Sequence, residues 1–179
     1  RLFSYDEIKK LLIKIKPDEI YYLAGQSSVE KSFQKKYETI KTNVIYCENF
    51  LKVIRFNSLN TKFFNAASSE IFGNHKKRVN LYSKKIPVSP YGKAKLKSFN
   101  LVRKYRNQFN LNAYNGIIFN TDSFLRPKSY LIPKICQSAI TSHKNKNIKI
   151  FFGDIDVIRD WGWCEEQIIY MWKHLQTKP

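Results

Sequence analysis

Short apolar runs alternate with helix-forming segments along the chain, and this alternation restricts the fold more than any other feature. The runs that read as buried strands are residues 19–24, 61–67 and 111–119. The segments with apolar residues at helical spacing are residues 5–16, 36–56 and 89–109. The apolar stripe expected on the longest of these helices is Ile40, Val44, Cys47, Leu51 and Ile54. This order predicts an α/β fold, in which helices cover a parallel sheet.

The regular alternation of apolar runs and helix-forming segments ends after Asn120. The pattern there predicts a helix over residues 132–142, a strand over residues 148–152 and a last helix from Glu165. We therefore expect two regions, residues 1–122 and residues 123–179.

The chain is strongly basic, with 32 Lys and Arg against 14 Asp and Glu and a formal net charge of +18. One interpretation is a polyanionic partner such as nucleic acid. The alternative is a lysine-rich surface in contact with solvent, which we favour because the charges are scattered and no nucleic-acid motif is present. We expect no nucleic acid among the partners.

The cysteines and the hydropathy pattern exclude other classes of protein. Cys47, Cys136 and Cys164 stand far apart and lack the spacing of a zinc site, so we expect no metal. Widely spaced, reduced thiols are typical of a cytoplasmic protein. No apolar run approaches the length that spans a membrane, so we also expect no membrane partner.

Polar side chains follow each predicted strand. Residues 23–27, residues 68–70 and the segment from Asn120 all come directly after an apolar run. In open parallel sheets, functional groups gather beyond the carboxyl ends of the strands. We therefore expect these three segments to open on the same edge of the sheet.

A tyrosine and a lysine on one helix give the clearest chemical signal. Tyr91 and Lys95 are four residues apart and share one helical face, so the ammonium should lower the pKa of the phenol. Ser68, Ser69 and Glu70 come from an upstream strand end and add hydroxyls and a carboxylate. The predicted function is proton transfer at a sugar-modifying active site. The alternative for Tyr91 and Lys95 is a surface pair on a basic helix. The alternative for Glu70 is a carboxylate that is favoured at a helix start by the helix dipole and has no catalytic role.

Several motifs together resemble the extended short-chain dehydrogenase/reductase family and, within it, the GDP-mannose 4,6-dehydratases. The resemblance covers nearly the whole chain. The segments that carry it include Gln26-Ser27, Ser68-Ser69-Glu70-Ile71-Phe72-Gly73, Ser89-Pro90-Tyr91, Asn115-Gly116-Ile117-Ile118-Phe119-Asn120 and Arg159-Asp160-Trp161-Gly162. It implies an incomplete Rossmann-like parallel sheet in residues 1–122, which would bind NAD(P), and part of a smaller substrate-binding region in residues 123–179.

The resemblance implies a dehydratase that uses hydride transfer as an internal step. Tyr91, held as a phenolate by Lys95, would take the proton of the sugar 4-hydroxyl while hydride passes to NADP. Glu70 would then remove the C5 proton and help to expel the 6-hydroxyl as water, before hydride returns to C6. Ser68 stands at the position of the family's catalytic threonine and would bind the 4-oxygen. The product would be a 4-keto-6-deoxy sugar.

The resemblance also assigns binding residues. NADP, with NAD as a possibility, would contact Leu23, Ala24, Gly25, Gln26, Ser27, Tyr91, Lys95 and Arg126. Asn120, Lys134 and Arg159 would bind the nucleotide sugar, since the planar guanidinium of an arginine suits a pyrophosphate. GDP-mannose is the first choice for this substrate. Full-length family members suggest a homodimer or homotetramer.

The chain departs from the family pattern in several places. The glycine-rich turn that holds the cofactor pyrophosphate is absent, so we interpret the sequence as a fragment that also lacks the C-terminal part. Thr121, Phe124-Leu125 and Trp163 replace family residues at the cofactor and substrate edges. Two alternatives follow: another NAD(P)-dependent nucleotide-sugar epimerase or dehydratase, or a truncated, non-catalytic remnant.

Overall fold

The computed structural model describes residues 4–75, 77–153 and 155–177, and it divides into two compact units. The first unit runs to Ile118 and resumes at Met171, and the second comprises Phe119–Tyr170. The division thus falls between residues 118 and 119 rather than at 122/123, and the end of the last helix belongs to the first unit. Each unit is described by itself below.

The first unit contains a three-stranded parallel sheet. Its strands are β1 (Glu19–Tyr22), β2 (Lys62–Ser68) and β3 (Ala113–Ile118), in the order β1-β2-β3. In this register Tyr22 pairs with Asn65 on one side of β2, and Ser68 pairs with Ile118 on the other. The predicted α/β fold with a parallel sheet is therefore confirmed.

Serine side chains cap α1 (Tyr5–Ile15), α2 (Val29–Gln34) and α5 (Pro90–Phe109) of the first unit. The other helical elements of this unit are α3 (Lys36–Ile40), the π-helical turn η1 (Lys41–Ile45), α4 (Tyr46–Phe56), the 3₁₀ turn η2 (Ser69–Ile71) and the end of α7 (Cys164–Gln176). Ser4 and Glu7 form a capping box on α1. Ser89 caps α5, which starts with a proline as sequence rules favour. The short helix α2 was not predicted.

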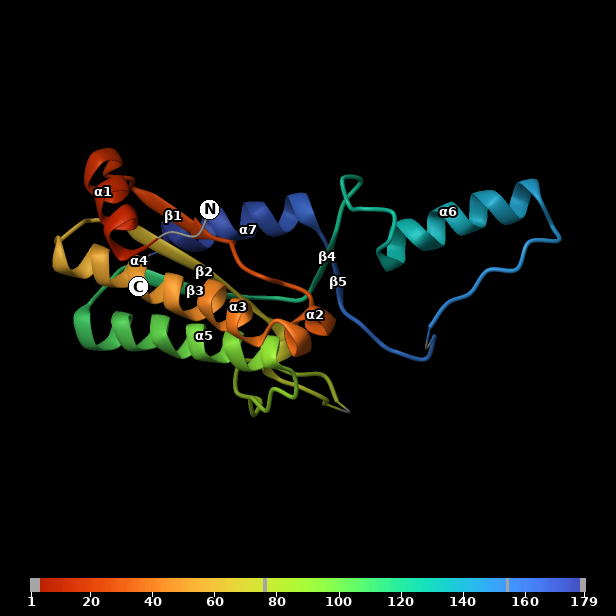
Figure 1. Ribbon diagram of the computed structural model, residues 1–179, viewed down its shortest axis with the longest axis horizontal. Coiled ribbons are helices and arrows are strands. Elements are labelled where there is room, and N and C mark those ends of the chain that lie inside the picture. The colour runs from red at the N-terminus through yellow and green to blue at the C-terminus, as the bar shows by residue number, and fades with distance from the viewer. Residues whose placement is uncertain (1–3, 76, 154, 178–179) are drawn as a thin grey trace. The chain divides into compact units, whose positions relative to one another are not determined.

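Helices cover both faces of the sheet (Figure 1). Because side chains alternate along a strand, Phe63 and Phe64 of β2 enter different cores. Phe63 packs with residues of α1, α4 and α5, among them Leu12, Leu51 and Val102. Phe64 packs on the other face with Tyr114 of β3 and with Leu175, at the C-terminal end of α7.

The long helix over residues 36–56 forms as predicted, but its buried face is only partly the predicted stripe. Cys47, Leu51 and Ile54 are buried, as expected. Ile40 is exposed, and Thr39, Thr42 and Asn43 are buried in the N-terminal half. The reason is the π turn, in which the Tyr46 N–H donates to the Lys41 carbonyl five residues back. This extra residue rotates the preceding part of the helix relative to α4.

The second unit has a two-stranded parallel sheet and one long helix. The strands are β4 (Asn120–Asp122) and β5 (Trp161–Trp163), and the helix is α6 (Leu131–Lys144). The strand predicted over residues 148–152 is wrong, since these residues have no regular structure. The apolar run finds no strand to pair with, and the Phe151 carbonyl instead accepts a hydrogen bond from Lys134 Nζ at 2.7 Å.

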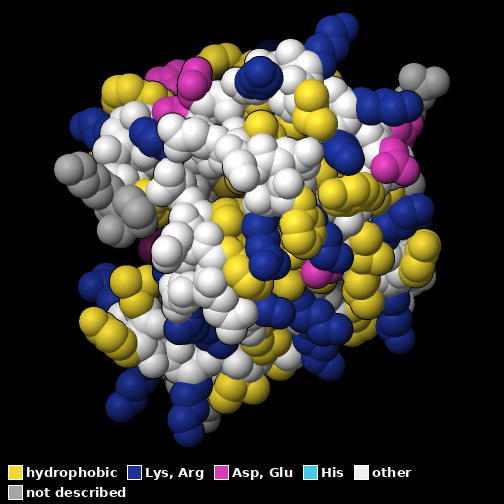
Figure 2. All heavy atoms as spheres, turned by 90° about the vertical axis from the view of Figure 1, so that its left-hand side faces the viewer, with side chains coloured by type: hydrophobic (Ala, Val, Ile, Leu, Met, Phe, Trp, Pro, Cys, Tyr) yellow, Lys and Arg dark blue, Asp and Glu magenta, His cyan; other side chains and the backbone are white. Residues whose placement is uncertain are grey.

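On the face shown in Figure 2, the basic residues are dispersed rather than collected in one patch. Figure 2 shows one face of the molecule, on which Lys and Arg side chains are spread among apolar ones and outnumber Asp and Glu. Among the described residues, no helix has both the length and the apolar character needed to cross a membrane.

Gly116 gives a test of the core on the α7 side of the sheet. A Cβ atom at this position would overlap the ring of Phe64, which is almost fully buried. Gly116→Ala should therefore lower the free energy of unfolding by about 1–3 kcal/mol, because the ring must move in a packed core. Chemical denaturation would measure the change. Gly153→Ala is the matched control, since a Cβ there meets no atom within 4 Å; equal losses in the two variants would contradict the packing argument.

Candidate active site

The carboxyl end of β2 supplies a serine and a carboxylate. Ser68 is the last residue of the strand and is buried, and Ser69 and Glu70 lie in the 3₁₀ turn η2 that follows. The Ser68 hydroxyl caps this turn by accepting a hydrogen bond from the Glu70 N–H at 3.2 Å. The strand end therefore fixes Ser68 and Glu70 relative to each other.

The N-terminus of α5 lies against this turn. Ser89 Oγ accepts a hydrogen bond from the Gly92 N–H at 2.9 Å, and the Tyr91 N–H donates to Ser32 Oγ at 3.2 Å. A Cβ on Gly92 would lie 2.5 Å from the Glu70 carbonyl oxygen, so only glycine allows this approach. The close packing brings the Tyr91 side chain beside Ser68 and Glu70, both of which influence its pKa.

Lys95 lies one turn further along α5 and is only 6% exposed. Its Nζ donates a hydrogen bond to the Ala66 carbonyl of β2 at 2.8 Å and lies 5.6 Å from the centroid of the Tyr91 ring. Burial lowers the pKa of Lys95 to about 8, against a smaller opposing effect of the buried Cys47 thiol. A lysine in this state exchanges protons near neutral pH.

The pKa of Tyr91 moves in the direction opposite to the prediction. Burial raises it, the Ser68 hydrogen bond lowers it, and the charge of Glu70 raises it further, with a net increase. The expected lowering by Lys95 is wrong for this structure, because the ammonium is directed to the Ala66 carbonyl rather than to the phenol oxygen. Ser68 is thus the residue that favours the phenolate.

The loop after β1 contains the residues predicted to contact the cofactor. Leu23, Ala24, Gly25 and Ser27 are exposed, whereas Gln26 is half-buried. The Gln26 side chain donates to Thr39 Oγ1 at 3.1 Å and to the Ser28 carbonyl at 2.9 Å. The Gln26 side chain therefore anchors the loop to the long helix, while the other four residues of the loop stay exposed.

Sequence reasoning missed the anchoring residues Thr39, Thr42 and Asn43. They are polar and lie outside the apolar stripe predicted for this helix. A usable signal was present: Thr and Asn lower helix propensity, and here they cluster immediately before the buried Cys47.

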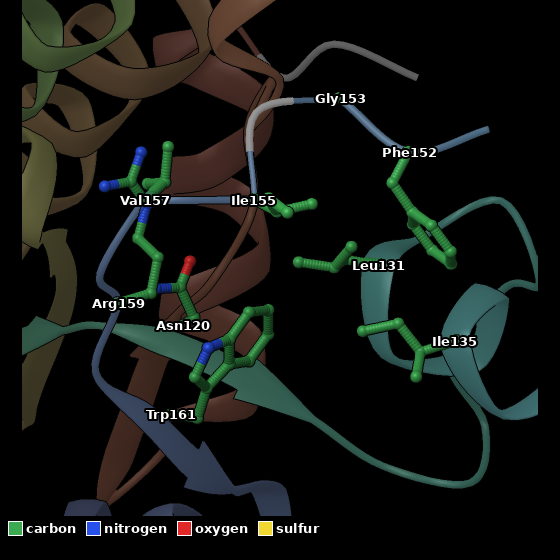
Figure 3. A pocket seen from close by; sticks show the side chains of 9 residues that line it. All are labelled: Asn120, Leu131, Ile135, Phe152, Gly153, Ile155, Val157, Arg159 and Trp161. Atoms are coloured by element: carbon green, nitrogen blue, oxygen red, sulfur yellow. The ribbon is translucent and has the colours of Figure 1, made fainter.

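The residues predicted to bind the nucleotide sugar lie in the second unit, where Asn120 and Arg159 line a pocket of about 650 Å³. Figure 3 shows these two residues and Trp161 on one side, with Leu131, Ile135 and Phe152 on the other. The remaining lining residues are Gly153, Ile155 and Val157. The pocket is thus apolar, with one guanidinium and one amide.

Two further predicted residues of the second unit do not line this pocket. The ammonium of Lys134 donates to the Phe151 carbonyl and lies over the Phe152 ring. Arg126 lies over the Tyr130 ring, 4.0 Å from its centroid, and its buried Nε has no hydrogen-bond partner.

Comparison with known proteins relates the chain to one family. The family model described as GDP-mannose 4,6 dehydratase matches residues 2–179. Similar curated proteins are GDP-mannose 4,6-dehydratases of Vibrio cholerae, 32% identical over 98% of this chain, and of Sinorhizobium fredii, 34% identical over 93%. The human GDP-mannose 4,6 dehydratase is 32% identical over 94% of the chain. The chain spans about half the length of these relatives, between 46% and 48%.

Solved structures with similar folds include nucleotide-sugar enzymes. RMD from Pseudomonas aeruginosa, solved with NADPH, gives a TM-score of 0.85 at 21% identity, with 97% of this chain and 61% of that chain covered. UDP-glucuronic acid 4-epimerase from Bacillus cereus, solved with UDP-glucuronic acid and NAD, gives 0.80 at 23% identity, with 99% and 55% covered. The predicted Rossmann-like fold is therefore confirmed. Since the family model extends over almost every residue, the chain belongs to the GDP-mannose 4,6-dehydratase family.

Proposed function

We propose that the protein is a nucleotide-sugar 4,6-dehydratase, a lyase that converts GDP-mannose to a 4-keto-6-deoxy sugar. The observation that carries the proposal is the convergence of Ser68, Glu70, Tyr91 and Lys95 at one end of β2. Membership of the family supports the substrate. Because the chain covers about half of its relatives, the proposal concerns the longest natural form that contains it.

The residues present fit a nicotinamide cofactor, NADP in the first instance and NAD as the alternative. Gly25 has a φ of +133° and no side chain, so the exposed loop 23–27 can lie close to a flat ring. Leu23, Ala24, Gly25, Gln26 and Ser27 would form that surface, with Tyr91 and Lys95 beside it and Arg126 as a further contact. When bound, the cofactor would supply hydride transfer to and from the sugar.

The chain's own residues would move the protons. Tyr91 would take the proton of the sugar 4-hydroxyl in its phenolate form, which the hydrogen bond from Ser68 favours. Ser68 would also hydrogen-bond the sugar oxygen. The Lys95 ammonium would contribute a nearby positive charge. Its pKa of about 8 would allow it to exchange protons with solvent. Glu70 would accept the C5 proton and return it to the departing 6-hydroxyl, which leaves as water. Ser69 holds the turn that carries Glu70.

The second unit would hold the nucleotide sugar. Arg159 and Asn120 line its apolar pocket, which suits a molecule with a flat base and a charged diphosphate. Lys134 is proposed as a further contact, although its ammonium is directed to the Phe151 carbonyl here. We also propose that the full-length protein is a homodimer or homotetramer in the cytoplasm, as family members suggest.

Tyr91→Phe tests the proton-transfer role. It removes the phenol oxygen and leaves the ring, so conversion of GDP-mannose should fall about 10³-fold. Product formation by chromatography would measure this. Tyr105→Phe is the control, because Tyr105 is also buried on α5 but lies outside the site. Activity retained in Tyr91→Phe would sink the assignment.

Glu70→Gln separates a dehydratase from a 4-epimerase or a reductase, since of these only the dehydratase needs a base at C5. The variant should bind GDP-mannose normally. The rate at which the C5 proton exchanges with deuterated solvent should fall about 10²-fold or more. Nuclear magnetic resonance of the sugar would follow the exchange. Glu48→Gln, which removes only a surface ion pair with Lys52, is the control. Unchanged exchange in Glu70→Gln would favour another base.

The pKa of Lys95 predicts a pH-dependent stability. Below pH 8 both the folded and unfolded states carry the charge, and the folded state bears the full cost of burying it. Between pH 8 and 10.5 the folded state loses the proton first, so this cost disappears as pH rises. The unfolding free energy of the wild type relative to Lys95→Met should therefore increase by about 3 kcal/mol across this window.

Urea denaturation at several pH values would measure the difference between the two proteins. Lys93→Met is the control, because Lys93 is exposed on the same helix. If the difference in unfolding free energy between the wild type and Lys95→Met stays constant from pH 7 to pH 10.5, Lys95 is not a buried ammonium that titrates in this range.

A further inference from the structure

Three polar side chains of the long helix are buried against the loop after β1. Thr39 is 0% exposed, Thr42 is 8% exposed and Asn43 is 1% exposed. All three precede or lie within the π turn Lys41–Ile45. A regular helix would have continued the apolar stripe and buried Ile40, which the π turn leaves exposed. The turn thus places hydrogen-bonding groups where the sequence pattern predicts aliphatic ones.

Two neighbouring side chains bind both backbone polar groups of Gln26. Thr42 Oγ1 accepts a hydrogen bond from the Gln26 N–H at 3.1 Å, and Asn43 Nδ2 donates to the Gln26 carbonyl at 3.0 Å. The Tyr22 hydroxyl, at the end of β1, donates to the Thr42 carbonyl. The path of the chain as it leaves β1 is therefore set by the π turn.

Asn43 does this at a cost to stability. Its Oδ1 is buried and has no hydrogen-bond partner, which is unfavourable for folding. A Cβ on Gly25 would lie 2.8 Å from this oxygen, so the loop packs directly on the amide. An aliphatic side chain of similar size would avoid the unpaired acceptor, but it would leave the Gln26 carbonyl without its donor.

We propose that Thr42 and Asn43 are positioning residues, which hold the loop 23–27 in the shape that receives the nicotinamide cofactor. The inference rests on the proposed function, since that function requires the loop to bind the cofactor. Neither residue needs to touch the ligand. Their contribution is preorganisation: a loop already fixed by Gln26 loses less conformational entropy when a ligand binds.

Thr42→Val and Thr42→Ser form the deciding pair. Valine keeps the shape of threonine and removes the oxygen that accepts from Gln26, whereas serine keeps the oxygen. The dissociation constant for NADP⁺, measured by calorimetric titration of the longest natural form, should rise about tenfold in Thr42→Val and stay near wild type in Thr42→Ser.

Thr61→Val is the matched control. Thr61 is also buried, and its hydroxyl donates to the Pro17 carbonyl at 2.8 Å, as the Thr42 hydroxyl donates to the Glu38 carbonyl at 2.8 Å. Thr61 lies at the opposite end of β2. This variant should lose stability without a change in NADP⁺ affinity. If Thr42→Val and Thr61→Val both lower the melting temperature and leave the affinity unchanged, Thr42 is only structural and the proposal is overturned.

Asn43→Leu gives a second readout that a structural role would not produce. Removing the unpaired Oδ1 should leave the melting temperature close to the wild-type value, while NADP⁺ affinity falls and the Gln26 region exchanges its amide hydrogens faster. Unchanged affinity and exchange would overturn the role of Asn43. A wild-type protein that binds neither NADP⁺ nor NAD⁺ would contradict the proposed function as well, whereas wild-type binding with unaffected variants contradicts only this inference.

Discussion

The hydrogen bond from the Lys95 ammonium to the Ala66 carbonyl joins the helix α5 to the central strand, and the geometry of the site depends on it. Burying an ammonium is costly, and this hydrogen bond offsets part of the cost. The bond anchors α5 to the strand one turn after Tyr91, whose side chain lies beside Ser68. A fold optimised for stability alone would place an aliphatic residue at position 95.

The sheet was predictable because its strands are short, apolar and separated by helical segments. The predicted runs 19–24, 61–67 and 111–119 overlap β1, β2 and β3, and no strand end differs from the prediction by more than two residues. The apolar run 148–152 looked the same in sequence and yet formed no strand. Whether such a run pairs depends on a neighbouring strand that is far away in the chain, and local pattern does not contain that information.

The candidate site was predictable in its residues but not in its electrostatics. The motif around Ser68, Glu70, Tyr91 and Lys95 identified the groups, and the structure brings them together. The direction of the Tyr91 pKa was missed because burial and the aim of Lys95 Nζ are properties of packing. The π turn was missed for a related reason: one extra residue in a helical turn changes which face is buried, and helical periodicity assumes that no such residue exists.

The strand β2 contributes to both hydrophobic cores and also ends in a residue of the candidate site. Phe63 and Phe64 enter opposite faces of the sheet, and Ser68 ends the same strand. Sliding this strand by one residue would send each phenylalanine to the wrong side and turn the serine away from its tyrosine. A misregistered chain would therefore lose its packing and the arrangement of its candidate site in the same event.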